Sequence, residues 1–378
     1  MPAPVRILHL HSSFDLGGPQ ARAIRLMTAW GDRARHTIAA VDEAFGARDA
    51  IPPGIGYEIA QNPPPLAGQP SVARFEVIAR FMRRFDLVLT YGWGAIDGVM
   101  AARAFAKDAP PVVHHEDGFD VDEAKGLKLH RNVYRRMALG AAGALVVPSQ
   151  ALETIALKNW KQPAARVHRI TPGVPLAQFA VPPRPDAIPG LTRHSDDVVI
   201  GALGGLRAVK DLPMLIRAVG GLAGRIRLVI VGEGPERRTI EGAAMAMGLG
   251  DRLVMPGQLA DPARFVGLFD ILALSSLTEQ FPTAVIEAMA AGVPIASTPV
   301  GDVAEMVAAE NRPYITPLHH EVFLRDALQP LVTHAAGRRH IGSLNRARAQ
   351  ADFGEEAMIA RFRSLYERVM GRPDGLQP

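Results

Sequence analysis

Two glutamates beside a predicted helix start offer the clearest chemistry in this chain. Glu279 and Glu287 lie eight positions apart across a Pro-Thr step, and residues 270–274 before them form a short apolar run typical of a buried strand. Pro282 suits the first turn of a helix, and Gly292 suits its C-terminal cap. We therefore expect Glu279 in the loop at the carboxyl end of a strand. Glu287 is expected inside a helix whose free N–H groups favour an anion such as phosphate.

A single lysine past the middle of the chain is a second candidate for chemistry. Arginine supplies nearly all of the positive charge, and Lys210 is the only lysine after Lys161. An ammonium group is a compact point charge that a guanidinium does not replace, so its isolated use suggests a specific need. Lys210 and the nearby Arg207 are therefore candidate cations. An incidental lysine and a surface arginine are the alternatives.

Further candidates follow the first strands of the N-terminal half. The pair Gly17-Gly18 comes after the predicted strand 5–11, where glycines allow either a close backbone approach to a ligand or simply a tight turn. The segment PVVHHEDGF is a strand running into a polar turn, and the imidazole of His115 is a candidate hydrogen-bonding group there. His114 alternates to the other face of the strand and is expected to be buried.

Strand-like and helix-like segments alternate along the whole chain, which is typical of parallel sheets with helices on both faces. A proline-dense stretch, 172–189, divides them and is typical of a linker. The predicted strands are 5–11, 36–41, 86–90, 111–114 and 144–147 before the linker, and 198–203, 227–231, 253–255, 270–274 and 294–297 after it. The predicted helices include 72–85, 123–139, 212–219 and a continuous helical region over 321–370.

The segment LTEQFPTAVIEAMAAGVPIAST, residues 277–298, resembles the E-x7-E signature of retaining GT-B glycosyltransferases of family 4. The context of the glutamates carries the resemblance, because Phe281-Pro282 precedes the predicted helix and an apolar strand follows Gly292. Similar pairs of glutamates also occur by chance. A solvated Glu279 and a surface Glu287 in an ordinary α/β unit are the alternative.

The resemblance implies an α/β protein of the GT-B fold, with two Rossmann-like doubly wound domains facing each other across a cleft. Residues 1–175 would form the acceptor-binding domain, and residues 176–354 the domain that binds the nucleotide-sugar donor. Residues 355–378 would form a helix that crosses back to the first domain, followed by a disordered tail.

The resemblance also implies roles for the candidate residues. The loop ALGGLRAVK is similar to the family's Gly-Arg-Leu-x-x-x-Lys loop, with Lys210 at the lysine position and Gly205 where the family has arginine, so Arg207 is the candidate second cation. Glu287 would bind the ribose hydroxyls, and Glu279 would lie by the donor sugar. His115 would bond the donor sugar or the incoming acceptor hydroxyl.

The candidate catalytic residues are therefore Glu279, His115 and Lys210. The candidate donor-binding residues are Gly17, Gly18, Arg207, Lys210, Glu279, Phe281, Pro282, Thr283 and Glu287. The resemblance implies that no metal cofactor is needed. A metal site at the adjacent groups from His114 to Asp117 is also disfavoured, because ligands spaced that tightly rarely close a coordination sphere unaided. Asp120-Val121-Asp122 spells Asp-x-Asp but is interpreted as charge at the start of the predicted helix 123–139.

Composition limits the remaining choices. The chain of 378 residues carries a net charge of +4, no cysteine and no run of 18 apolar residues, so we expect neither disulfides nor a membrane span. Without a recognisable secretory segment, the expected location is the cytoplasm, with peripheral contact at the inner membrane face as an addition. The basic and apolar segment 74–84 is a candidate for such contact, although packing on the sheet is the favoured interpretation. No basic block is dense enough to indicate nucleic acid.

The function that the resemblance implies is transfer of a hexose from a UDP- or GDP-sugar, with retention of configuration, to a glycan or lipid-linked acceptor in polysaccharide or glycoconjugate biosynthesis. Two alternatives remain open. A nucleotide-sugar 2-epimerase would share the architecture and release a free sugar, and a non-catalytic nucleotide-sugar-binding subunit would explain the glycine at position 205.

Overall fold

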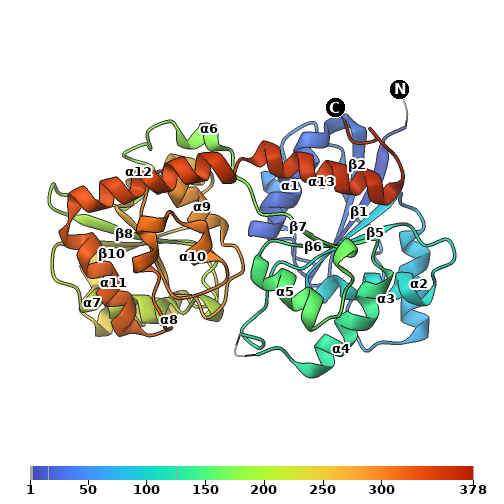
Figure 1. Ribbon diagram of the computed structural model, residues 1–378, viewed down its shortest axis with the longest axis horizontal. Helices are drawn as coiled ribbons and strands as arrows, with labels where there is room; N and C mark the ends of the chain where they lie inside the picture. The colour runs from blue at the N-terminus through green and yellow to red at the C-terminus, as the bar shows by residue number, and fades with distance from the viewer. Residues whose placement is uncertain (1–2, 16, 125, 378) are drawn as a thin grey trace. The chain divides into compact units, whose positions relative to one another are not determined.

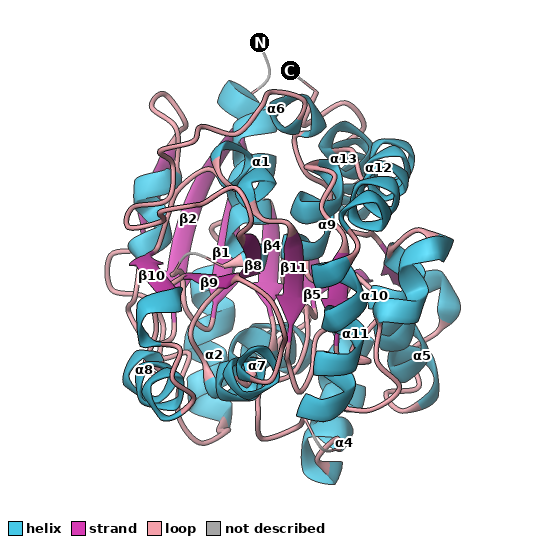
Figure 2. Ribbon diagram, turned by 90° about the vertical axis from the view of Figure 1, so that its left-hand side faces the viewer, coloured by secondary structure: helices cyan, strands magenta, loops and turns pink. Residues whose placement is uncertain are grey.

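The computed structural model describes residues 3–15, 17–124 and 126–377. The chain divides into two compact units. The N-terminal unit comprises Met1–Gly118, Gly126–Pro172 and Ala357–Pro378, and the C-terminal unit comprises Phe119–Lys125 and Gly173–Glu356. Each unit has one parallel sheet with helices packed around it (Figures 1 and 2). The prediction of two doubly wound α/β domains is confirmed.

The sheet of the N-terminal unit has the strand order β3-β2-β1-β4-β5-β6-β7. Its strands are β1 (Val5–His11), β2 (Ala34–Ala40), β3 (Tyr57–Ile59), β4 (Leu87–Tyr91), β5 (Val112–His115), β6 (Ala144–Val147) and β7 (Val167–Arg169). Its helices are α1 (Gly18–Trp30), α2 (Val72–Met82), α3 (Ile96–Ala104), α4 (Leu129–Ala138), α5 (Gln150–Lys158) and, from Ala357 onward, α13 (Glu355–Met370).

The sheet of the C-terminal unit has the order β10-β9-β8-β11-β12. Its strands are β8 (Val198–Leu203), β9 (Ile226–Val231), β10 (Leu253–Gly257), β11 (Ile271–Leu274) and β12 (Ile295–Ser297). Its helices are α6 (Leu176–Phe179), α7 (Leu212–Gly220), α8 (Arg237–Ala246), α9 (Thr283–Ala290), α10 (Val303–Met306), α11 (Glu321–Thr333) and α12 (Ala335–Asp352).

Strand residues alternate between two apolar layers in this unit, as strand geometry requires. Ile200 and Ile271 point into the layer that contains α7, α8 and α11, whereas Val199 and Leu272 point into the layer that contains α9 and α10. Both faces of the sheet are thus covered. The strand ends remain as the places where polar side chains can gather.

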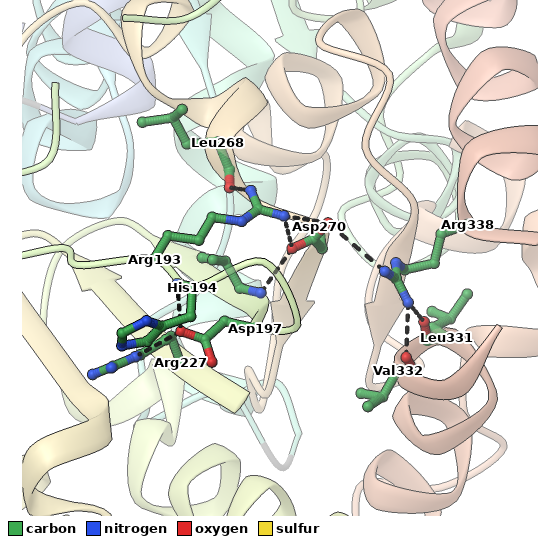
Figure 3. Close-up of polar contacts among 10 residues, drawn as sticks. Arg193, His194, Asp197, Arg227, Leu268, Asp270, Leu331, Val332 and Arg338 are labelled. Carbon is green, nitrogen blue, oxygen red and sulfur yellow. Dashed lines mark hydrogen bonds and ion pairs between the residues drawn. The ribbon is translucent and has the colours of Figure 1, made fainter. Parts of the chain in front are cut away.

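The amino ends of β8 and β11 are fastened by a dense polar network (Figure 3). Asp270, just before β11, accepts hydrogen bonds from the backbone N–H of Val199 at 2.8 Å and from the guanidinium of Arg193 at 2.8 Å. Arg338 lies on its other side, and it also donates to the carbonyls of Leu331 and Val332. This edge of the sheet is therefore occupied by internal contacts.

The terminal helix packs within the N-terminal unit. Phe362, Leu365 and Tyr366 are buried in one apolar cluster with Ile7 and other strand residues. The chain then turns back, and Leu376 is fully buried in the same cluster, with its N–H donated to the Glu367 carboxylate at 2.9 Å. The described residues after Gly371 are therefore ordered, and the expectation of a disordered tail is wrong for them.

Three other local predictions differ from the structure. The helix expected over 123–139 begins only at Leu129, so Asp120-Val121-Asp122 is not its N-terminal charge, and its Lys125 lies outside the described residues. The helical region 321–370 is divided into α11, α12 and α13, because His334 and Phe353 leave the helical conformation. The strands β3 and β7 were not predicted, since each has only three residues and little apolar character.

Candidate functional site

The candidate donor residues of the C-terminal unit follow two neighbouring strands at their carboxyl ends. Because β8 and β11 are parallel and adjacent, the loops that follow them meet at one edge of the sheet. Two hydrogen bonds join these loops: the N–H of Leu277 donates to the Val209 carbonyl, and the hydroxyl of Ser275 donates to the Lys210 carbonyl, both at 2.8 Å. Residues about seventy positions apart are thereby fixed side by side.

Lys210 and Glu279 form an ion pair at this edge. The Lys210 ammonium donates to Oε1 of Glu279, and the hydroxyl of Ser276 donates to the same oxygen at 2.9 Å. The side chains of Lys210 and Glu279 are 20% and 14% exposed, so the pair is shielded yet reachable. Charge-assisted hydrogen bonds of this kind hold both groups in defined positions.

The glycine-rich loop 203–207 leaves room for the cations. Gly204 has φ +139°, a conformation that favours glycine, and a side chain at this position would begin 3.9 Å from the Lys210 ammonium. At Gly205, a side chain would begin 3.7 Å from Nε of Arg207. Arg207 is exposed, and its guanidinium has no ion-pair partner within the described ranges. Arg207 thus folds back beside the position where the family carries its arginine.

The turn after β9 supports this loop from the side. Gly232 and Gly234 have φ of +148° and +156°, and the space for a side chain on either is taken by the carbonyl oxygens of Gly204 and Leu206. The N–H of Leu206 also donates to the Glu233 carbonyl at 2.8 Å. Both glycines are needed because two backbone segments approach closely here.

Helix α9 begins next to Glu279. Its N-cap residue is Pro282, whose side chain makes no capping hydrogen bond. Phe281 packs against Phe353, with ring centroids 5.7 Å apart, so its backbone rather than its ring is available to a ligand. Thr283 opens the helix, where unpaired N–H groups attract anions.

Glu287 lies within α9 and is only 7% exposed. The alternative of a surface Glu287 is therefore wrong. Burial of a carboxylate is costly unless polar groups meet it, and Glu287 has such interactions in this structure. Its role toward a ribose stays a prediction.

Residues that sequence reasoning did not select hold the Lys210 loop in place. Asp211 follows Lys210 with φ 42°, and its carboxylate caps α7 by accepting from the N–H of Met214 at 3.4 Å. His319 lies 3.3 Å from the Asp211 carboxylate and 3.0 Å from the Ser275 carbonyl. Asp211 could have been noticed as a predicted helix cap, whereas no pattern in the sequence marks His319.

The glycine pair of the N-terminal unit starts helix α1. Gly17 is the N-cap in an extended conformation, Gly18 is the first helical residue, and both are exposed. The space for a side chain on Gly17 is limited by the Gln20 amide, whose Oε1 would lie at 2.9 Å. The extended backbone and the flexible Gln20 side chain would tolerate another residue at position 17, so the turn alone does not require this glycine. Contact with a diphosphate stays a prediction.

His115 is fully buried in the N-terminal unit. Its Nε2 lies 2.6 Å from the Tyr366 hydroxyl, and its Nδ1 lies 3.2 Å from the Thr90 carbonyl. Burial, followed by the nearby Arg22 charge, lowers the pKa of His115 well below its usual value. Both ring nitrogens are used inside the unit, so the expected hydrogen bond to a sugar is not supported by this geometry. His115 instead fastens β5 to α13.

The polar turn after β5 carries a different pair of charged groups. Arg22 donates to both carboxylate oxygens of Asp117, at 2.6 and 2.8 Å. Burial alone would lower the pKa of the Arg22 guanidinium, but the charge of Asp117 outweighs burial and raises it. This bidentate pair joins α1 to the end of β5, and the sequence offered no spacing that links two residues so far apart.

The expectation of a reaction without a metal cofactor stays a prediction. Within the described ranges, no group of three or more His, Cys, Asp or Glu side chains is placed to hold a metal ion. His114 and Glu116 lie 3.9 Å apart, and Glu116 is engaged by Arg135. Likewise, no helix in the described part of the chain is long and apolar enough to cross a membrane.

Two protein-family models match the chain, one in each half. The model "Glycosyltransferase Family 4" matches residues 16–178, and the model "Glycosyl transferases group 1" matches residues 184–332. The second match contains both loops of the Lys210–Glu279 edge.

The similar curated proteins and solved structures share a low sequence identity with this chain. N-acetyl-alpha-D-glucosaminyl L-malate synthase of Bacillus anthracis is 25% identical over 43% of this chain and 44% of its own. D-inositol 3-phosphate glycosyltransferase of Mycobacteroides abscessus is 28% identical over 55% of this chain and 48% of its own. The matched part thus spans about half the length of these relatives. HepE of Anabaena, solved in complex with UDP and glucose, has 20% identity and a TM-score of 0.79, with 95% of this chain and 98% of that one covered.

Proposed function

Because this chain belongs to the GT-B glycosyltransferase family, we propose that it transfers a hexose from a UDP- or GDP-sugar to a glycan or lipid-linked acceptor. The proposal includes retention of configuration and a reaction without a metal ion. The observation that carries it is the Lys210–Glu279 ion pair beside the start of α9, at the edge of the C-terminal sheet where the loop with Arg207 also lies.

Charge explains why such an arrangement suits this reaction. Breaking the bond between the anomeric carbon and the diphosphate leaves additional negative charge on the leaving nucleotide. The Lys210 ammonium, the Arg207 guanidinium and the first N–H groups of α9 are fixed donors that can meet this charge. The Glu279 carboxylate balances the charge of the Lys210 ammonium. A bound diphosphate would share the ammonium with that carboxylate.

The carboxylates would act on the sugar and the ribose. Glu279 is held by Lys210 and Ser276, so its second oxygen, Oε2, can accept from a sugar hydroxyl or stabilise positive character at the anomeric carbon. Glu287 would accept from the ribose hydroxyls. HepE, which shares the fold, was solved with UDP-glucose, which supports a nucleotide-sugar donor for this chain too.

A panel of labelled UDP- and GDP-sugars tests the proposal. A transferase is expected to bind one donor and hydrolyse it slowly without an acceptor. Release of an isomerised free sugar would indicate an epimerase instead, and donor binding without turnover would indicate a binding subunit. A glycoside product whose anomeric configuration is inverted relative to the donor, or turnover that a chelator abolishes and a metal restores, would overturn the mechanism.

A further inference from the structure

Two adjacent histidines precede helix α11, and their rings contact different parts of the C-terminal unit. His320 is the N-cap of α11, where its Nδ1 accepts the N–H of Val322 at 3.2 Å. The His319 ring instead reaches the loops that follow β8 and β11. His320 thus caps its own helix, whereas His319 contacts the edge of the sheet that carries Lys210.

The segment that carries His319 is fixed on the sheet. Ile315 pairs with Ser297 of β12 in a parallel bridge, and the N–H of Thr316 donates to the Ser297 carbonyl at 2.8 Å. The hydroxyl of Thr316 donates to the Leu318 carbonyl at 2.9 Å, which restrains the chain just before His319. Because its backbone is held in this way, the His319 ring can support the loops that it touches.

One nitrogen of the His319 ring bridges two loops. Its Nε2 lies 3.0 Å from the carbonyl oxygen of Ser275 and 3.3 Å from a carboxylate oxygen of Asp211. Both oxygens accept hydrogen bonds and neither donates, so Nε2 carries the hydrogen that they share. Ser275 is buried and the side chain of Asp211 is only 26% exposed, so this contact is shielded from most of the solvent.

Both of these contacts lie next to Lys210. Asp211 is the following residue, and it adopts a left-handed conformation with φ 42° and ψ 46°, which costs free energy in a residue other than glycine. Ser275 donates its hydroxyl to the Lys210 carbonyl at 2.8 Å. The imidazole of His319 therefore restrains the residue after Lys210 and also the loop that contacts the Lys210 carbonyl.

The backbone at Lys210 decides where its ammonium can lie. The ammonium pairs with Glu279, and a bound diphosphate would compete for it. Its position then depends on the backbone from which the side chain extends. A misplacement of about 1 Å in a group that meets developing charge can cost up to about a hundredfold in rate. An interaction made mainly in the transition state affects kcat more than it affects binding of the substrate.

We propose that His319 is a positioning residue of the transfer reaction, which fixes the Lys210 loop through Asp211 and Ser275 and does not itself touch the donor. The proposal rests on the proposed function, because it requires that Lys210 meets the charge of the leaving nucleotide. His319 then affects turnover only through Lys210, and its effect falls on kcat more than on the KM for the donor.

Substitutions at position 319 test the proposal on the full chain. His319→Ala should lower kcat about tenfold and change the donor KM by less than about threefold. His319→Gln should recover most of kcat, because the glutamine amide nitrogen reaches the position of Nε2, whereas the shorter His319→Asn should not. His320→Ala removes the neighbouring helix cap and is the matched control. It should lower the unfolding midpoint in urea and leave kcat unchanged.

A combined variant distinguishes failure of the positioning role from failure of the proposed function. If His319 acts through Lys210, adding His319→Ala to Lys210→Ala should lower kcat further by no more than about twofold. A full additional tenfold loss, or an equal loss of kcat in His319→Ala and His320→Ala, would overturn the positioning role alone. Normal turnover in Lys210→Ala would instead remove the lysine from the proposed mechanism, and the positioning role with it.

A second measurement does not need turnover. The chain has only six lysines, so NMR of isotopically labelled lysine can resolve their side-chain signals, and Lys210→Ala identifies the signal of Lys210. This signal should shift in His319→Ala, return toward its original position in His319→Gln and stay in place in His320→Ala. An unchanged Lys210 signal in His319→Ala would show that the ring does not hold the lysine.

Discussion

The two edges of the C-terminal sheet use charged residues in opposite ways. At the amino edge, the Asp270 carboxylate is engaged by Arg193, by the Val199 N–H and by Arg338. At the carboxyl edge, Lys210 has one carboxylate partner, and Arg207 has no ion-pair partner in the described part of the chain. The amino edge is thus fully paired for stability. The carboxyl edge keeps charge available, which is how a binding site differs from a structural network.

The largest effect is expected at the carboxyl edge. Lys210→Ala should lower turnover at least about a hundredfold, because a preorganised cation aimed at developing charge contributes about 10²–10³ in rate. The unfolding free energy should change less than that of Asp270→Ala, since Ser276 still donates to the Glu279 carboxylate. Turnover and urea denaturation measured on the same preparations separate the two quantities.

Lys107→Ala, at an exposed lysine of the N-terminal unit, is the matched control and should retain full turnover. Near-normal turnover in Lys210→Ala would remove this lysine from the proposed mechanism. Lys210→Arg should recover only part of the loss, because a guanidinium does not reproduce the position of a compact ammonium.

At the amino edge, a substitution should lower stability and leave turnover unchanged. Asp270→Ala leaves the Val199 N–H without its acceptor and removes the ion pairs with Arg193 and Arg338, and should lower the unfolding free energy by about 2–3 kcal/mol. Asp270→Asn keeps one acceptor oxygen and should cost less. Turnover per folded molecule should be unchanged in both variants. A loss of turnover without a loss of stability would contradict the contrast between the edges.

The N-terminal unit offers a further comparison, because it contains buried histidines that carry no charge. His11 and His36 are buried, and burial lowers the pKa of each to about 3. An unfolded histidine titrates near 6.5, so the unfolded chain binds more protons between about pH 6.5 and about pH 3. The stability of the folded chain with these two neutral histidines is therefore complete above about pH 6.5. It is lost as the pH falls through this window. The unfolding free energy should be lower at about pH 5 than at about pH 7 by at least about 2 kcal/mol.

His11→Phe sharpens this test. The His11 ring stacks on Tyr91 with centroids 4.0 Å apart, and neither of its nitrogens has a hydrogen-bond partner among the described residues. Phenylalanine keeps the ring packing and removes the titration. The variant should therefore show a shallower acid dependence with undiminished stability near pH 7. An unchanged acid slope would assign the effect to other groups.

Much of the fold could be predicted because buried strands have a local signature. The strands 144–147 and 198–203 have the predicted bounds, since each is an apolar run bounded by polar or turn residues. β3 and β7 lack that signature, and their pairing depends on neighbouring strands. The start of α4 was also misplaced, because Gly126, with φ +155°, departs from the helical conformation before Leu129.

The candidate site was predicted in part for a similar reason. Lys210 and Glu279 follow strands that are adjacent in the sheet, so a motif in each loop was enough to bring them together. The surroundings of His115 could not be predicted, because they depend on Tyr366, which lies 251 positions later. His319 was missed for the same reason. Contacts between distant segments have no pattern in a single sequence.

The smallest predicted effect concerns the glycine that departs from the family pattern. Arg207→Ala should weaken donor binding about tenfold, because one exposed charge-assisted contact is lost. A side chain at Gly205 would begin at ordinary contact distance, 3.7 Å or more, from its nearest neighbours, so Gly205→Arg can be accommodated. If Arg207 supplies the cation that the family places at position 205, adding Gly205→Arg to Arg207→Ala should restore donor affinity. Donor binding by calorimetry that stays weak in the double variant would show that the two positions are not equivalent.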